Sequence, residues 1–252
     1  MSFPLTATKI AFAGDWHGQY NYMKRACYWA HKKGAEVIVQ VGDFGFWKDS
    51  AAYDLLNAQL EEWGMYLLFI DGNHENFPLL YNTPLNNDGV RPIRDRIIHL
   101  PRGFRWSWYI YTFTALGGAH SIDKDYRLDG VDWFKEEDIT VDDMKKTVDG
   151  GPTDFLITHD SPYSADTPLD PAFAAQFSDQ QVHECDLSRW MLEKVCQDIT
   201  PTWIVHGHYH VGYEAETKWN NGGTCKITGL DRDGSAFDRN MIIVDLTELD
   251  LA

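Results

Sequence analysis

The first third of the chain alternates short apolar runs with helical patterns, and this alternation restricts the fold more than any other feature. Apolar runs predict strands at Lys9–Ala13, Glu36–Val41 and Met65–Ile70, and the segments between them, Tyr20–Lys33 and Ser50–Trp63, have the spacing of amphipathic helices. Strand–helix–strand order requires crossover connections, which are right-handed and join parallel strands. The sequence therefore predicts an α/β fold built on a parallel sheet.

The rest of the chain predicts more strands and one clear helix. The expected strands are Ile97–Leu100, Trp108–Leu116, Asp154–Thr158, Trp203–Val205, Tyr213–Glu216 and Met241–Leu246. The helix, Leu187–Ile199, is stopped by Pro201, and the charged segment Ser121–Gly150 is expected to be a solvated insertion or a helix pair. No linker or repeat divides the chain, so a single domain over residues 1–252 is the simpler interpretation.

Five of the apolar runs end in a carboxylate, an imidazole or an amide. The residues at these ends are Asp15, His17, Asp43, Asn73, His74, His159, His208 and His210. Each alone has a structural explanation, such as a helix cap or a turn. Because the carboxyl ends of strands in an open α/β sheet gather along one edge, five such placements together indicate a common site.

The donor types at these strand ends indicate divalent metals. Carboxylates, imidazoles and an amide oxygen suit Mn²⁺, Fe²⁺ or Zn²⁺. No cysteine stands among these strand-end residues, which disfavours a thiolate site. Seven ligands exceed the needs of one tetrahedral ion, but they suit two ions that share a carboxylate. Such a pair can activate a water between the ions and stabilise in-line displacement at phosphorus.

These residues resemble the motifs of the calcineurin-like metallophosphoesterase superfamily, which follow the order DxH, GD, GNH with Asp or Glu, a lone His, and GHxH. The chain has Asp15-Trp16-His17, Gly42-Asp43, Gly72-Asn73-His74-Glu75, His159 and Gly207-His208-Tyr209-His210 in that order. The resemblance implies a four-layer α/β/β/α sandwich, in which two mixed β-sheets are flanked by helices.

The resemblance also implies a role for each residue. Asp15, His17 and His210 would hold the first metal, and Asp43 would bridge to the second. Asn73, His159 and His208 would hold the second metal. His74 would be catalytic, steadying the phosphate or protonating the leaving group. The cofactors implied are two divalent ions, manganese first, with iron, zinc or nickel as alternatives.

One branch of the superfamily, the phosphoprotein phosphatases, has GDxxDRG at the second motif, and this chain departs from it. Phe46 and Trp47 stand where that branch has the acid that orients the catalytic histidine and the arginine that grips phosphate. Glu75 does match the GNHE form of that branch. The loss of both groups argues against membership of the branch, and what orients His74 stays open.

Substrate contacts are less well indicated than metal ligands. Arg102 and Arg105 lie in a segment that holds five of the ten arginines, and they are expected either at the rim of the site or on a surface loop. Arg127 is the candidate to fill the vacant arginine role. His206 is expected to support the metal ligands or to contact substrate, and Trp16 or Trp47 either to stack on a base or to pack.

The predicted function is a metal-dependent phosphodiesterase that acts on nucleotides, cyclic ones included, through a metal-bridging hydroxide. The alternatives are a phosphomonoesterase or a nuclease. A non-catalytic scaffold is the least favoured alternative. A net charge of −16 disfavours partners such as long nucleic acids. The N-terminus lacks a signal-peptide pattern, no apolar run could cross a membrane, and the four cysteines form no CxxC pair. We therefore expect a cytoplasmic enzyme without membrane contact; its oligomeric state is left open.

Overall fold

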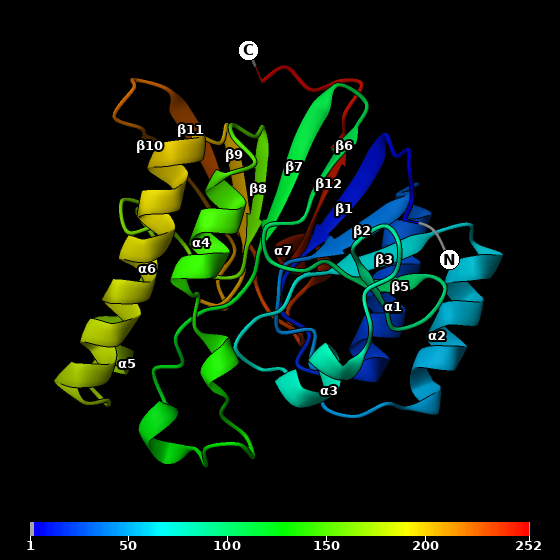
Figure 1. The fold of residues 1–252 in the computed structure, drawn as a ribbon. Coiled ribbons are helices and arrows are strands. Elements are labelled where there is room, and N and C mark those ends of the chain that lie inside the picture. Colours follow the sequence, from blue (N-terminus) through cyan, green and yellow to red (C-terminus); the bar gives the residue numbers. More distant parts are fainter. Residues whose placement is uncertain (1–2, 252) are drawn as a thin grey trace.

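Two β-sheets of six strands each pack face to face, and helices cover their outer sides (Figure 1). This computed structural model describes residues 3–251. In spatial order, the strands of the first sheet are β12 (Met241–Asp245), β1 (Lys9–Ala13), β2 (Val37–Gln40), β3 (Tyr66–Phe69), β5 (Ile97–His99) and β4 (Arg91–Pro92). Those of the second are β10 (Tyr213–Lys218), β11 (Thr224–Gly229), β9 (Trp203–His206), β8 (Phe155–Thr158), β7 (Tyr111–Leu116) and β6 (Arg105–Trp108).

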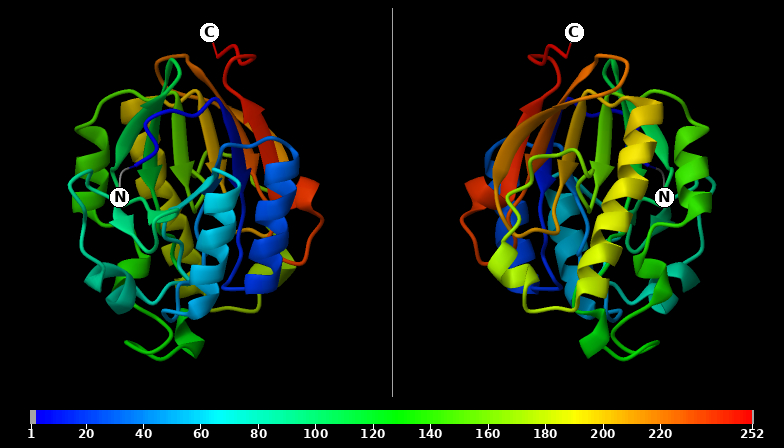
Figure 2. Two further views of the ribbon diagram at one scale, coloured as in Figure 1. Left: turned by 90° about the vertical axis from the view of Figure 1, so that its right-hand side faces the viewer. Right: turned by 90° about the vertical axis from the view of Figure 1, so that its left-hand side faces the viewer.

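Seven α-helices accompany the sheets within residues 3–251. They are α1 (Tyr20–Lys32), α2 (Ala51–Glu62), α3 (Phe77–Asn82), α4 (Val141–Val148), α5 (Pro171–Ala174), α6 (Asp179–Ile199) and α7 (Phe237–Asn240). Figure 2 shows α1 and α2 against one outer face of the sandwich and α6 against the other. No helix in this described part of the chain is long and apolar enough to cross a membrane.

Three layers of apolar side chains hold the sandwich together. Between the sheets, rings such as Phe12 and Phe155 stack with centroids 6.0 Å apart. On one outer face Leu56 of α2 belongs to the cluster that joins α1 and α2 to the first sheet. On the other, Leu192 of α6 packs in a cluster with Ile204 of β9. Both sheets contain parallel and antiparallel pairs, so the predicted sandwich of two mixed sheets is confirmed.

Parallel pairing places the carboxyl ends of several strands at one edge. In the first sheet β1, β2 and β3 are mutually parallel, as the alternating pattern predicted. In the second sheet β7, β8, β9 and β11 are parallel. The loops that follow β1, β2, β3, β8 and β9 therefore leave the sandwich at the same edge, and these loops carry the motif residues.

Some predicted elements differ from those in the structure. The run predicted as one strand, Trp108–Leu116, is divided between β6 and β7, which form a hairpin whose turn includes Tyr109 at a φ of 55°. Helix α6 begins at Asp179, because Ser178 caps it by accepting a hydrogen bond from the Gln181 backbone N–H. The charged segment from 121 to 150 contains two short 3₁₀ turns and α4, and β11 was not predicted.

Candidate metal centre

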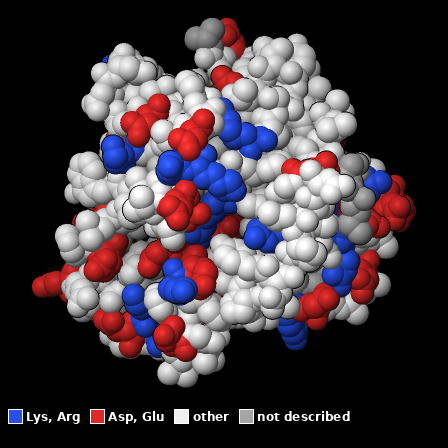
Figure 3. Space-filling model, in the orientation of Figure 1, with Lys and Arg blue, Asp and Glu red and all other residues white. Residues whose placement is uncertain are grey.

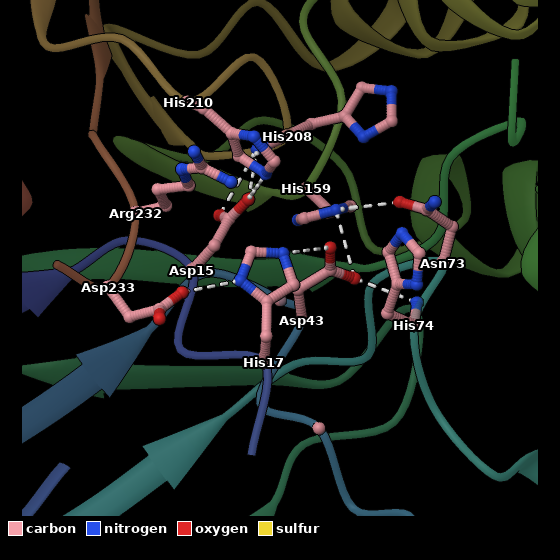
Figure 4. Close-up of polar contacts among 12 residues, drawn as sticks. Asp15, His17, Asp43, Asn73, His74, His159, His208, His210, Arg232 and Asp233 are labelled. Carbon is pink, nitrogen blue, oxygen red and sulfur yellow. Dashed lines mark hydrogen bonds and ion pairs between the residues drawn. The ribbon is translucent and has the colours of Figure 1, made fainter. Parts of the chain in front are cut away.

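The seven predicted ligands meet at the carboxyl-terminal edge of the sheets (Figure 4). Ligand atoms of Asp15, His17, Asp43 and His210 all lie within 4.8 Å of one another. On the other side of Asp43, the Nε2 atom of His159 lies 3.0 Å from the Asn73 Oδ1. The ring centroids of His159 and His208 are 5.0 Å apart.

Asp43 lies between two groups of ligands. Its Oδ2 atom faces the Nε2 atom of His17 at 3.4 Å, and its Oδ1 atom faces the Nε2 atom of His159 at 3.3 Å. Beyond His17, the His210 Nε2 lies 3.1 Å from the Asp15 Oδ2. A carboxylate with one oxygen toward each group has the position required of a bridge between two ions.

The charges of this cluster fit cations. Asp15 and Asp43 are both buried. Burial alone would lower the pKa values of His17 and His159, but Asp43 and Asp15 outweigh it and raise them to about 9 and about 10. Two buried carboxylates thus hold protons on histidines that have metal-ligand spacing. Divalent ions would displace those protons and supply positive charge in their place, so the residues present fit a pair of divalent metals.

Hydrogen bonds outside the ligand set orient the ligands. The Nδ1–H group of His17 donates to Asp233 Oδ1 at 2.7 Å, which leaves Nε2 toward the cluster. The Nδ1–H group of His159 donates to the Val41 carbonyl oxygen at 2.9 Å. The Asn73 amide donates through Nδ2 to Ser121 Oγ at 2.9 Å, so its oxygen is directed into the site. Sequence reasoning missed Asp233 and Ser121, because neither adjoins a motif.

The backbone of the site is strained. His17, Asp43, His208 and His210 have φ angles of 43°, 55°, 69° and 55°. Such left-handed conformations cost roughly 1–3 kcal/mol each in non-glycine residues, and they persist where surrounding structure enforces them. At Gly207, a Cβ would lie 2.0 Å from Asp15 Oδ1, so only glycine leaves room for that carboxylate.

His74 points into the site and contacts Arg127. The Nη2 atom of Arg127 donates to His74 Nε2 at 2.8 Å, and Arg127 pairs with Asp123 at 2.9 Å. The backbone N–H of His74 donates to Asp43 Oδ1 at 2.8 Å. Burial lowers the pKa of His74, and Arg127 lowers it further against the opposing charge of Asp43. An arginine held by an acid therefore lies beside His74, the histidine expected to be catalytic.

Phe46 and Trp47, which replace two residues of the GDxxDRG motif, serve packing, and Glu75 of the next motif holds their loop. Glu75 is fully buried and accepts hydrogen bonds from the backbone N–H groups of Phe46 at 2.6 Å and Gly45 at 3.2 Å. Its burial raises its pKa to about 8. Phe46 belongs to the apolar cluster beneath α1 and α2, and Trp47 lies against Phe134.

Arg102 and Arg105 make their contacts within the chain and not at the rim of the site, which was one of the two positions expected for them. Arg102 is buried, and its Nε atom donates to Asp71 Oδ2 at 2.8 Å while its other nitrogens reach backbone carbonyls of the segment before α4. Arg105 donates from Nη1 to the Gly151 carbonyl oxygen at 2.7 Å. Both guanidinium groups anchor loops, and neither lines the cavity described below.

His206 and Trp16 are also committed to internal contacts. His206 is fully buried, its Nε2 atom lies 2.7 Å from the Tyr213 hydroxyl, and its Nδ1–H donates to the Gly207 carbonyl oxygen. It therefore supports the loop that carries His208 and His210, which was one of its two expected roles. Its ring nitrogens are bound within the chain and do not face the cavity. The fully buried Trp16 packs as well, with its indole N–H bonded to Asn240 at 3.1 Å.

A cavity of about 720 Å³ opens beside the ligands. Asp43, Asn73, His74, Arg127, His208 and His210 form part of its lining. The rest comes from the loop after Ser121, the segment 168–177 and one side of α6. A volume in this range suits a small-molecule substrate.

A two-sheet sandwich that gathers carboxylates, imidazoles and an amide beside such a cavity is the architecture of a metal-dependent hydrolase. Residues 8–212 match the family model of the calcineurin-like phosphoesterases. The chain therefore belongs to this family, and the family supports a phosphoesterase activity at a binuclear metal centre.

Solved structures show the same fold at low sequence identity. A dimetal phosphatase from Danio rerio is 10% identical and has a TM-score of 0.56, over 98% of this chain and 94% of that one. The TT1561 protein of Thermus thermophilus is 12% identical with a TM-score of 0.52, over 96% and 100% of the two chains. No curated protein sequence matches this chain significantly.

Proposed function

We propose that this protein is a metal-dependent phosphodiesterase whose substrates are nucleotides, cyclic nucleotides included. The observation that carries the proposal is one cavity with two kinds of lining. Metal-ligand candidates and His74 line part of it, and apolar side chains such as Phe173 and Phe177 line another. A phosphoester linked to a large, partly apolar organic group fits both parts.

In this proposal, seven residues would hold the metal ions and His74 would act on the substrate. Two divalent ions, manganese first, would supply positive charge to the phosphoryl group and lower the pKa of an attacking water. Asp15, His17 and His210 would hold one ion, Asn73, His159 and His208 the other, with Asp43 between them. The imidazole of His74 lines the cavity beside the ligands, where it would steady the phosphate or give a proton to the leaving alcohol.

A phosphomonoesterase is the second candidate, and Arg127 is the observation that favours it. A monoester dianion carries one more negative charge than a diester and benefits from an additional cation. Arg127 lines the cavity and contacts His74, so it would supply the cation that the second motif lacks. The apolar lining favours the diester of a nucleoside, and we keep that substrate as the first proposal.

A nuclease for long strands is less well supported. Arg102 and Arg105, which could have supplied a local track for phosphates, bind other parts of the chain instead. On the face in Figure 3, basic side chains form a short band that acidic side chains border, and no extended basic surface is visible on that face. Neutralisation of many phosphates requires such a surface.

Metal analysis combined with matched nitrophenyl mono- and diesters tests the proposal. We expect two divalent ions per chain and, at saturating Mn²⁺, a higher kcat/KM for bis(p-nitrophenyl) phosphate than for p-nitrophenyl phosphate. A clear monoester preference would favour the second candidate. Full activity in a chelated, metal-free preparation would refute a binuclear mechanism. If the metal-loaded protein hydrolysed neither ester, the result would favour a non-catalytic scaffold.

A further inference from the structure

Part of the cavity wall is an aromatic cluster that the metal chemistry does not use. Leu169, Phe173 and Phe177 line the cavity from the segment around α5. Phe173 is 50% exposed and Leu169 is 45% exposed. Large apolar side chains that stay exposed beside a cavity gain free energy when a ligand covers them.

The geometry of the cluster is suited to planar groups. The rings of Phe173 and Phe177 meet edge to face, with centroids 5.1 Å apart and planes at 62°. Tyr126 approaches Phe177 from the opposite loop at 6.1 Å and 64°. Edge-to-face pairs leave ring faces free, and a flat ligand ring can stack on such a face.

The two loops that carry these rings are tied to each other. Asp125, next to Tyr126, accepts a hydrogen bond from the Gln181 amide at 2.8 Å and another from the Ser178 hydroxyl at 3.0 Å. Figure 1 shows α5 at the start of α6, where these bonds form. The aromatic wall is therefore held in place before a ligand arrives, which lowers the entropic cost of binding.

The charges near the wall are acidic. Asp170 and Asp186 line the cavity. Asp170 accepts a hydrogen bond from the Ala172 backbone N–H at 2.9 Å, and Asp186 forms no ion pair with any residue from 3 to 251. The cation beside them, Arg189, is directed at backbone carbonyl oxygens, including that of Pro162 at 3.2 Å. Carboxylates accept hydrogen bonds and repel further phosphates, so this part of the cavity suits a group with N–H donors.

We propose that Phe173 and Phe177, together with Asp186, form a subsite for a nucleobase that carries an exocyclic amino group. The inference rests on the proposed function, because it names the organic group of the phosphodiester whose phosphoryl group lies at the metal ligands. The rings stack on the base, and the carboxylate accepts hydrogen bonds from its amino group. Specificity then comes from a segment outside the metal-binding motifs.

Two diesters separate this subsite from the metal chemistry. Adenosine 3′,5′-cyclic phosphate carries an aminopurine, whereas the smaller ribose 3′,5′-cyclic phosphate has the same diester ring and no base or other aromatic ring. In the Mn²⁺-loaded protein, the double variant F173A/F177A should raise KM for the cyclic nucleotide about tenfold or more, the loss expected from removing base stacking. The kcat/KM for the small ester should change less than about twofold, because this ester gains nothing from a base subsite.

Matched variants control for packing and folding. Trp190 is exposed on α6, the helix that also carries Asp186, and it stacks on Tyr163 outside the cavity. Trp190→Ala should therefore change the kinetic constants of neither substrate. Phe173→Ala alone removes a half-exposed ring and should show a smaller effect in the same direction. Asp186→Asn should reduce, about tenfold, the preference for the aminopurine over the same nucleotide without its amino group.

Binding of adenosine to the metal-free protein gives a readout independent of turnover. The double variant should weaken this binding about tenfold. Equal losses on both diesters, no loss on either, or unchanged adenosine binding would overturn the subsite. Preferred cleavage of glycerophosphocholine would also overturn it, because aromatic rings and carboxylates can hold a quaternary ammonium. If the wild type cleaves neither diester but binds adenosine, the proposed function fails and the subsite stands.

Discussion

Replacing Arg127 by methionine tests whether the cation beside His74 acts on substrate phosphate. The guanidinium donates to His74 Nε2 at 2.8 Å, pairs with Asp123 at 2.9 Å and lines the cavity. Its side chain is only 9% exposed, so water screens its charge poorly. Methionine keeps much of the side-chain length and removes the charge and all five donors.

The size of the effect follows from one lost contact. A hydrogen bond between charged groups contributes about 1.5–3 kcal/mol. Since about 1.36 kcal/mol changes a rate tenfold, Arg127→Met should lower kcat/KM for a monoester dianion roughly 10- to 150-fold. A diester, with one charge fewer, should lose less. The metal content should stay at the wild-type level, because Arg127 contacts no metal-ligand candidate.

The assay compares p-nitrophenyl phosphate with bis(p-nitrophenyl) phosphate at saturating Mn²⁺, with metal content measured on the same samples. Lys124→Met is the matched control, because Lys124 lies in the same segment but over the Trp133 ring at 4.2 Å. Arg127→Lys should recover only part of the activity, since an ammonium lacks the planar fork. Unchanged activity would refute a phosphate contact, and equal losses on both esters would indicate that Arg127 only orients His74.

Four further results are expected. Asp43→Asn should reduce activity and metal content more than loss of any single terminal ligand, because an amide bridges two ions poorly; metal analysis with diester kinetics checks this. His74→Ala should keep two metals and lose turnover, and a parallel loss of metal would make His74 a ligand. Asp233→Asn should weaken metal affinity about 10- to 100-fold in chelator competition, because the carboxylate orients a ligand imidazole. Burial opposes the charged form of His120, but hydrogen bonding to Asp138 outweighs it and raises its pKa. The His120–Asp138 contact contributes fully to the free energy of unfolding below the pKa of His120 in the unfolded chain, about 6.5. This contribution is lost as the pH rises through the higher pKa of the folded protein. His120→Gln should therefore lower Tm more at pH 5.5 than at pH 8.5, and an equal loss at both would contradict this linkage.

The alternating pattern predicted the parallel strands β1, β2 and β3, and the resemblance of the motifs to the calcineurin-like family implied the two-sheet sandwich and the set of candidate ligands. Strand periodicity is a local property, and the motif residues follow strands directly. Parallel pairing therefore brings Asp15 and Asp43 to one edge of the first sheet and His159 to one edge of the second, and the packing of the two sheets joins these edges. Local patterns failed where tertiary contacts decide. The apolar run around Tyr109 hides a hairpin turn, and the polar first turns of α6 carry no clear periodicity.

The contacts around the metal-ligand candidates could be known only from the tertiary structure. His17 meets Asp233 across a wide separation in sequence, and no motif marks this partner. Arg127 was a candidate from the sequence, but its contact with His74 exists only in the folded chain. Arg102 shows the converse. The sequence left it either at the rim of the site or on a surface loop, and in the folded chain it forms a buried ion pair with Asp71. Backbone hydrogen bonding and side-chain periodicity are encoded within a few residues. Which charges neutralise one another, and which stay free for substrate, depends on contacts that exist only once the sheets and loops have packed.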